Sequence, residues 1–145
     1  MAIEERVLPT PAPFVQPEIT AFWEGTARGE LLLPRCRKCD GVIWYPRPYC
    51  PRCASVDVEW TAASGRGTIY SYTVNRRGQA DLPAYREAGV YVLAYVELDE
   101  GPRVMTNIVS CDPDSVRIGQ PVEVVFHDTG AGNALPRFRP VAAEA

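Results

Sequence analysis

The sequence predicts a mainly β protein in which a short N-terminal helix precedes a metal-binding ribbon and a small closed barrel of five strands. Two Cys-x-x-Cys pairs separated by ten residues predict the ribbon. Short alternating apolar runs in the second half of the chain predict the strands, and 14 prolines and 11 glycines among 145 residues disfavour long helices. We therefore divide the chain into an N-terminal arm and helix (1–29), a zinc ribbon (30–62) and an OB-type barrel domain (63–145).

The N-terminal part is expected to be an arm followed by a helix. Residues 1–16 contain three prolines at alternate positions, which favour an extended arm lying on the protein or a partner, or extending freely into solvent. Pro17 suits a first helical turn and Gly29 suits a helix end. One helical face carries Ile19, Phe22, Trp23 and Thr26. We expect Phe22 and Trp23 to cover the chain's own β-core, and docking into a partner subunit is the alternative.

Four cysteines form the clearest motif of the chain: Cys36, Cys39, Cys50 and Cys53. Each Cys-x-x-Cys is a tight turn that directs two thiolates toward one metal ion, and two such turns complete a tetrahedron. In the cytosol thiols stay reduced, so the pairs indicate metal ligands rather than disulfides. Because four protein sulfurs close the coordination shell, we expect one structural Zn²⁺, with iron as the less favoured alternative.

Basic side chains crowd these cysteines: Arg35, Arg37, Lys38, Arg47 and Arg52. Four thiolates and one Zn²⁺ carry a formal charge of about −2. We interpret the basic cluster as compensation for that charge. A nucleic-acid-binding patch is the alternative, but the net charge of −3 opposes it, because phosphate neutralisation supplies most of the affinity of nucleic-acid binders.

Five segments are expected to form antiparallel strands of the barrel: 67–74, 90–98, 103–109, 121–127 and 136–141. Residues 99–101 suit a tight turn between the second and third strands, and residues 112–119 suit a single helical turn. Within the ribbon, residues 42–45 are expected to pair back as a strand. The alternation of Val56, Val58 and Trp60 with polar residues indicates a further half-buried strand.

We find no self-contained catalytic set in the sequence. The single histidine, His127, is expected on a strand, so a nucleophilic pair with Cys111 is not favoured and Cys111 is interpreted as a buried thiol. The glycine-rich residues 130–134 precede no expected helix and are interpreted as a loop. Apolar runs fall short of the ~20 residues that span a membrane, and the N-terminus lacks a signal-peptide core. We therefore expect a cytoplasmic protein without a membrane partner.

Several segments together are characteristic of one family. In the first half they are Phe22-Trp23-Glu24-Gly25, Gly29-Glu30-Leu31, Cys36-Arg37-Lys38-Cys39, Tyr45-Pro46-Arg47 and Cys50-Pro51-Arg52-Cys53. In the second half they lie at residues 64–73, 98–101, 118–122 and 135–140. From about Pro17 to Pro140 the chain resembles acyl-CoA-associated proteins that join a rubredoxin-like zinc ribbon to an OB-fold. The resemblance implies an N-terminal helix, the ribbon and a five-stranded OB barrel.

The resemblance also implies a role. Members look like small partners of thiolase-like enzymes that form or cleave carbon–carbon bonds in CoA thioesters, among them aldolases of steroid side-chain CoA thioesters, thiolases and acyltransferases. The partner is expected to hold the catalytic residues, so this chain is not an enzyme by itself. It is expected to bind and support that partner in a hetero-oligomer, a heterotetramer or larger.

A ligand or partner region is expected on the barrel, because OB barrels bind ligands on one strand face and its bordering loops. Here that region comprises Tyr70, Tyr72, Asn75, Arg76 and Arg77 with the loop 78–89. Arg76 and Arg77 suit the phosphates of CoA. The alternative is that both arginines are solvated or pair with carboxylates of a partner.

Two other functions stay open at this point. One is a stand-alone acyl-CoA binding or carrier module. The other is a single-strand nucleic-acid binder, which would use aromatic side chains over a basic groove. From Ser64 onward the chain has eight basic and ten acidic residues, so the second is the less favoured.

Overall fold

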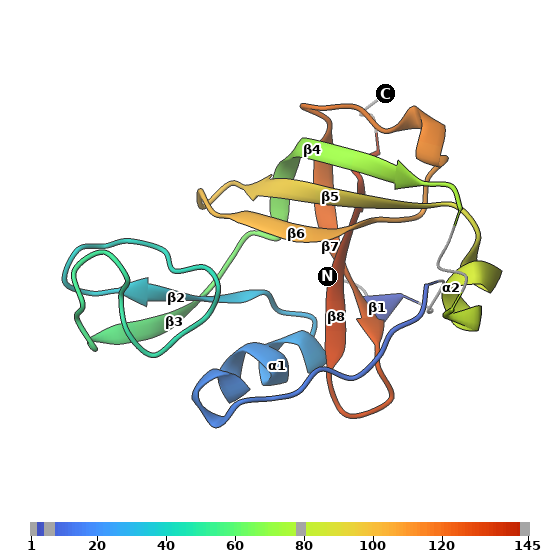
Figure 1. Ribbon diagram of the computed structural model, residues 1–145. Coiled ribbons are helices and arrows are strands. Elements are labelled where there is room, and N and C mark those ends of the chain that lie inside the picture. The colour runs from blue at the N-terminus through green and yellow to red at the C-terminus, as the bar shows by residue number, and fades with distance from the viewer. Residues whose placement is uncertain (1–2, 5–7, 78–80, 143–145) are drawn as a thin grey trace.

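The computed structural model describes residues 3–4, 8–77 and 81–142, and it contains a ribbon, a barrel and a helix between them (Figure 1). The ribbon is built on strands β2 (Leu32–Cys36) and β3 (Val58–Ala62) and projects to one side of the barrel. Helix α1 (Thr20–Ala27) contacts β2 of the ribbon and β8 (Ala134–Pro140) of the barrel. None of the helices in these stretches combines the length and the apolar character needed to cross a bilayer.

The barrel consists of β8 and the four strands β4 (Arg66–Asn75), β5 (Tyr91–Leu98), β6 (Arg103–Ile108) and β7 (Pro121–Asp128). It closes in the order β7-β4-β5-β6-β8, with β8 returning to β7. The five predicted strands and their closure are confirmed. The expectation that all pairs are antiparallel was wrong, because β6 and β8 run parallel. A closed ring with an odd number of strands cannot reverse direction at every junction, so at least one pair must be parallel.

The barrel interior is a continuous apolar core. Its buried side chains come from every strand of the barrel and include Ile69, Val92, Val104, Val122, Phe126 and Phe138. Gly67 allows β4 and β5 to approach closely, because a Cβ there would lie 2.4 Å from the backbone oxygen of Glu97. A 3-10 turn at Pro113–Ser115 connects β6 to β7, as predicted for that segment.

The helix forms where it was predicted, as a 3-10 turn (Pro17–Ile19) that continues into α1. Gly29, with φ 74°, follows the helix, and its N–H donates to Thr26 O at 3.1 Å. The Thr26 hydroxyl donates to Trp23 O at 2.6 Å and accepts from the Ala134 N–H at 3.1 Å, which ties α1 to β8. Phe22 belongs to the chain's own core and Trp23 packs against that core, as expected.

The ribbon pairs differently from the prediction. β2 and β3 are antiparallel neighbours, with Cys36 opposite Val58. Residues 42–45, predicted as a strand, make only an isolated bridge between Arg35 and Val42. The bridge lies on the edge of β2 opposite β3, where the Ile43 N–H donates to Pro34 O at 2.8 Å, and Pro34 has no N–H to return a bond and extend the ladder. Val56 lies outside β3 and is 80% exposed.

The described part of the N-terminal arm lies on the barrel, which decides between the alternatives left open by the sequence. A two-residue strand, β1 (Ile3–Glu4), runs parallel to β7. Further along, the guanidinium of Arg137 donates to Pro9 O at 2.7 Å and to the Thr10 hydroxyl at 3.0 Å. Arg137 and Thr10 are both 4% exposed, so a buried cation holds the arm against β8.

A second helix, α2 (Pro83–Ala88), was not predicted and lies in the loop expected at 78–89. It ends at Gly89, whose φ is 74°. The ring centroids of Tyr85 on α2 and Tyr91 at the start of β5 lie 5.9 Å apart. Residues 78–80 of this predicted binding loop lie outside the described residues.

Candidate metal centre and adjoining groove

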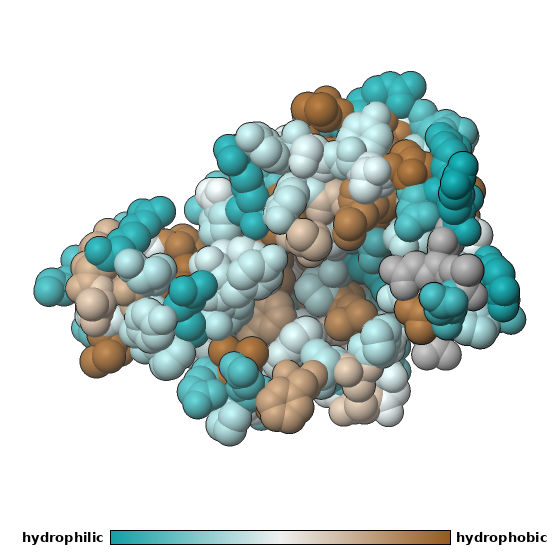
Figure 2. All heavy atoms as spheres, viewed as in Figure 1, coloured by the Kyte–Doolittle hydropathy of each residue, from teal (hydrophilic) through white to brown (hydrophobic). Residues whose placement is uncertain are grey.

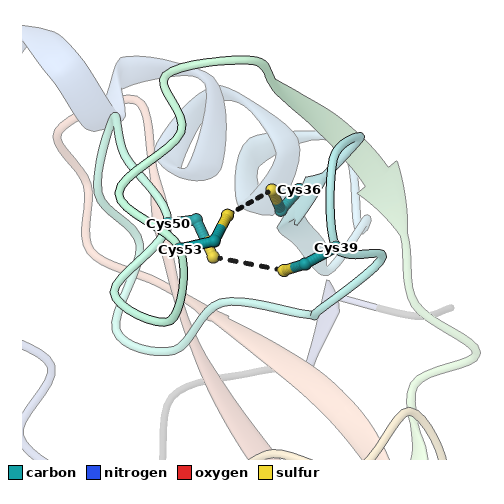
Figure 3. A group of neighbouring side chains, drawn as sticks. All are labelled: Cys36, Cys39, Cys50 and Cys53. Carbon is teal, nitrogen blue, oxygen red and sulfur yellow. Dashed lines mark hydrogen bonds between the residues drawn. The ribbon is translucent and has the colours of Figure 1, made fainter.

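The four predicted cysteines converge at the end of the ribbon, where their sulfur atoms face one another (Figure 3). All four ligand atoms lie within 4.8 Å of one another. The closest approaches are 3.6 Å between Cys36 Sγ and Cys53 Sγ, and 3.5 Å between Cys39 Sγ and Cys50 Sγ. Tetrahedral Zn–S bonds of about 2.3 Å place sulfurs about 3.8 Å apart. The cluster therefore fits a four-coordinate ion after shifts of about 1 Å or less in the sulfur positions.

The two Cys-x-x-Cys turns are built alike. In the first, the N–H of Asp40 donates to Cys36 O at 2.9 Å; in the second, the N–H of Ala54 donates to Cys50 O at 2.9 Å. Asp40 and Ala54 adopt left-handed conformations, with φ 63° and 57°. This repeated geometry folds each pair back so that both of its sulfurs point to the same centre.

The local electrostatics favour thiolates at some positions and oppose them at others. Cys36 accepts hydrogen bonds from the backbone N–H groups two and three residues further on, chiefly that of Cys39, and these lower its pKa. Burial opposes ionisation of Cys50, but the corresponding N–H groups and the neighbouring thiols lower its pKa to about 6. The N–H of Gly41 favours the Cys39 thiolate, yet the adjacent sulfurs and burial raise its pKa to about 11. Four thiolates therefore need a bound cation.

Two of the arginines in the basic cluster are paired within the ribbon. Arg35 donates to both carboxylate oxygens of Asp40, at 2.7 and 2.8 Å. Arg37 lies 3.1 Å from Glu59 and 3.7 Å from Asp57. Carboxylates, as well as the thiolates, therefore balance the charge of these side chains.

Beside the ribbon lies an apolar groove that the sequence did not predict. It has a volume of about 520 Å³ and lies where α1, the ribbon and the barrel meet. Figure 2 shows this face hollowed between α1 and the barrel, with apolar side chains gathered in and around the hollow. Its aromatic lining residues are Phe22, Trp23, Trp44, Tyr45 and Tyr85. These residues come from three separate segments, so no local sequence pattern reveals the groove.

Two family models match the chain one after the other. Residues 23–59 match the rubredoxin-like zinc ribbon domain of ChsH2, and residues 60–127 match its C-terminal OB-fold domain. A DUF35 domain-containing scaffold protein of Methanothermobacter thermautotrophicus is 41% identical over 93 residues, which cover 63% of this chain and 68% of that protein. The chain belongs to the DUF35 family.

Other similar proteins carry enzyme-subunit names. A benzoylsuccinyl-CoA thiolase subunit BbsA of Thauera aromatica is 32% identical over 124 residues, 80% of this DUF35 chain and 81% of that protein. A probable enoyl-CoA hydratase alpha subunit of Thermomonospora curvata is 38% identical over 125 residues, 86% of this chain; the match spans only 38% of that protein's length. The solved structure of an Ltp2-ChsH2(DUF35) aldolase matches with a TM-score of 0.79 at 34% identity, covering 90% of this chain and 100% of that one.

The predicted tyrosines of this DUF35 chain lie on opposite faces of β4. A bulge between Ile69 and Ser71 leaves Tyr70 as the extra residue, which reverses the alternation of the strand. Tyr70 is exposed, and the guanidinium carbon of Arg103 lies 3.7 Å from its ring centroid. Tyr72 is half-buried and packs against the core. The two rings therefore do not form one stacking surface.

The polar residues at the end of β4 contact other parts of the DUF35 barrel. Arg76 forms an ion pair with Asp114 in the turn before β7. The amide of Asn75 donates to the Tyr91 hydroxyl at 2.8 Å, and its side-chain oxygen accepts from the Arg77 N–H at 3.3 Å. Arg76 is thus held by a carboxylate of this chain, and Arg77 is exposed to solvent.

His127 and Cys111 of the DUF35 chain contact different residues and do not form a pair. His127 is fully buried, and its Nδ1 lies 2.9 Å from an Arg137 nitrogen. Cys111 lies in the turn after β6; burial and the charge of Asp112 raise its pKa, although a hydrogen bond with Ser115 opposes them. Cys111 is only partly buried, so the prediction of a buried thiol was wrong in degree, but a thiol with a raised pKa is a poor nucleophile.

Proposed function

We propose that this chain is a non-catalytic subunit that binds and supports a thiolase-like enzyme acting on acyl-CoA thioesters. The observation that carries the proposal is the match to the DUF35 chain of an aldolase whose name pairs it with a second protein, Ltp2. The closed cysteine site supports it, because four protein sulfurs leave no position for a substrate. The partner would then supply the reacting groups.

We further propose that the cysteine site holds one structural Zn²⁺. Cys36, Cys39, Cys50 and Cys53 would bind it, and the ion would stabilise a ribbon too small to fold on its own apolar core. Its chemistry is structural, since the ion would neutralise thiolates and cross-link the two turns. A cytoplasmic location agrees with this role, because reduced thiols are required.

The reaction of the proposed partner is carbon–carbon bond cleavage or formation on a CoA thioester. Retro-aldol cleavage of steroid side-chain CoA thioesters, and thiolysis or acyl transfer, are the candidate reactions. Support comes from the names of similar proteins, which include an aldolase and a benzoylsuccinyl-CoA thiolase subunit. CoA thioesters occur in the hydratase and thiolase names alike.

The outer face of β5 and β6 suits a protein partner. It presents Leu93, Tyr95 and Met105, which are between 39% and 48% exposed, and Tyr95 lies opposite Met105 in the sheet. Aromatic and methionine side chains are enriched in protein interfaces, and charged side chains are depleted. OB barrels that bind single strands use this face. An apolar face of this kind opposes the nucleic-acid alternative.

Co-purification tests the proposal. The tagged chain, expressed with its genomic neighbours, is expected to bring down a thiolase-like chain. Tyr95→Glu is expected to abolish that recovery, because it buries an unpaired charge in the interface. Ala131→Glu, at the exposed tip of the β7–β8 loop, serves as the matched control. Recovery of no enzyme chain by the wild type would overturn the proposal.

The groove favours a second candidate function, a stand-alone acyl-CoA binding or carrier module. Such a module works without an enzyme partner. The same co-purification therefore distinguishes the two, since a carrier brings down no thiolase-like chain.

A further inference from the structure

We propose that the groove between α1, the ribbon and the barrel binds the apolar acyl part of a CoA thioester, in particular one that carries a ring system. The choice of a CoA thioester rests on the proposed function. The preference for a large, uncharged, apolar group rests on the groove itself. The partner enzyme would then act on the thioester end while this chain holds the acyl end.

Three walls of the groove are apolar. Phe22 and Trp23 come from α1, Trp44 from the ribbon, and Met105 and Leu135 from the barrel. The rings of Phe22 and Trp23 meet edge to face with centroids 4.9 Å apart, which fixes their orientation. A volume of about 520 Å³ lies within the range of small-molecule sites, about 300–1,000 Å³. Flat aromatic walls suit a flat or polycyclic guest.

Two polar side chains along the groove already have partners inside the protein. The Thr106 hydroxyl donates to Pro136 O at 3.2 Å, and the Asn107 amide donates to Val92 O at 3.0 Å. The indole nitrogens of Trp23 and Trp44 have no hydrogen-bond partner among the described residues, but they are buried and inaccessible, so both rings present carbon to the groove. An extended peptide would leave its own amides unsatisfied against such walls, whereas a hydrocarbon has none to satisfy. The groove therefore favours an acyl group over a peptide segment.

The charge of the lining points the same way. Among its described residues Arg137 is the single charged side chain, and no carboxylate or lysine lines the groove. Arg137 is 4% exposed, and its terminal nitrogens hold the arm and contact His127. The groove thus offers no exposed cation for the CoA phosphates, which must stay outside it. Recognition is confined to the acyl end.

The position of the groove links it to the ligand face of OB barrels. Met105 lies on the outer face of β6, and it lines both the groove and a smaller hollow over Tyr95 and Leu93. OB barrels bind ligands on this strand pair. In this chain α1 and the ribbon cover one edge of that face and convert it into a groove with apolar walls.

Tryptophan fluorescence of the full metal-loaded chain tests the proposal, because Trp23 and Trp44 line the groove. The two probes are 2-naphthoyl-CoA and acetyl-CoA, which share the CoA part and differ in the acyl part. We expect saturable quenching by 2-naphthoyl-CoA, with acetyl-CoA at least about tenfold weaker, because only the larger acyl group buries its surface.

Two variants place a charge in opposite walls of the groove, Met105→Glu in the barrel and Tyr45→Glu in the ribbon. Both positions are largely exposed, at 48% and 53%, so the fold should tolerate the change, and circular dichroism checks it. Each is expected to weaken 2-naphthoyl-CoA binding at least about tenfold. Val56→Glu, at an exposed apolar position outside the groove, is expected to bind like the wild type.

Equal binding of the two CoA esters, or folded groove variants that bind like the wild type, would overturn the proposal. A third result would also overturn the proposal: the groove variants lose the enzyme partner in co-purification, and the wild type binds both esters alike. The groove would then be a protein-docking site. Quenching without any recovered partner would instead retain the groove and refute the subunit role. The two failures are therefore distinguishable.

Discussion

The sulfur atoms of Cys36 and Cys50 are fully buried, and each accepts hydrogen bonds from the turn that follows it. Cys50→Ser is expected to reduce bound metal from about one ion per chain to near zero, because three sulfurs no longer close the shell. Loss of metal-binding energy should lower the melting temperature by roughly 10 °C or more. Elemental analysis and thermal denaturation measure both. Cys111→Ser, outside the cluster, is the control and should keep the metal.

A substitution at Gly67 tests the close approach of β4 and β5. A Cβ at this position would lie 2.4 Å from Glu97 O and 2.8 Å from a Val96 methyl carbon. Gly67→Ala is therefore expected to destabilise the barrel by about 1–3 kcal/mol, since backbone must move to admit it. Chemical denaturation measures the change. The neighbouring exposed Thr68→Ala should cost less, and equal stability of both variants would refute the close approach.

For single residues, the sequence predicts which side chains can bind a metal better than it predicts which face of a strand a side chain occupies. The spacing of the cysteines is sufficient to predict that their four sulfurs cluster, because each Cys-x-x-Cys forms its turn locally. Tyr70 and Tyr72 were both expected in one ligand region, because OB barrels bind ligands on one strand face. The bulge at Tyr70 separates them, and it depends on pairing with β5 rather than on the sequence of β4 alone.

Among the elements, the N-terminal arm depends on one buried side chain. Arg137→Met would leave Pro9 O, the Thr10 hydroxyl and His127 without its donors, at a cost of about 1–3 kcal/mol. Hydrogen exchange of a peptide covering residues 8–13 should become faster, while exchange in the ribbon stays unchanged. Arg139→Met removes a half-exposed pair with Glu123 and should leave the arm protected. Faster exchange of the arm in both variants would contradict the conclusion that Arg137 holds the arm against the barrel.

Secondary structure was predictable where the residues of a single segment determine it, without contacts to another segment. The limits of α1 follow from Pro17 and Gly29, and the barrel strands follow from their alternation. Residues 42–45 were misjudged because Pro34, on the edge of β2 that faces Val42 and Ile43, has no N–H to extend the pairing beyond one bridge. The missed helix α2 has only six residues and no acidic residue in its first turn, so it leaves little periodicity and no capping signal to detect.

On the scale of the whole molecule, the cysteine end of the ribbon and the barrel rest on different interactions. Cys36, Ile43 and Cys50 form a small apolar cluster of their own, whereas Leu33 of β2 belongs to the barrel core and Trp60 of β3 packs against it. Removal of the metal with a chelator is therefore expected to reduce hydrogen-exchange protection in the two cysteine turns and the adjoining ends of β2 and β3, while β4–β8 keep theirs. Exchange mass spectrometry before and after chelation measures this. Uniform loss of protection across the chain would mean that both units unfold together.

The groove is a property of the whole molecule that the sequence could not reveal. Its lining residues Phe22, Trp44, Met105 and Leu135 are dispersed over more than one hundred positions and meet only after the helix, ribbon and barrel have packed. Phe22 and Trp23 were selected for the helical face they share. Tyr45 and Met105 carry no local motif, and their significance follows from exposure beside buried aromatic rings.

Reconstitution tests the central claim most directly. The purified chain and the thiolase-like protein encoded beside it would be assayed for cleavage of an acyl-CoA thioester, separately and at increasing ratios. We predict no turnover by this chain alone, and a rise in the activity of its partner that levels off at a fixed molar ratio. Turnover by the isolated chain, or a partner whose activity and stability ignore its addition, would contradict the account.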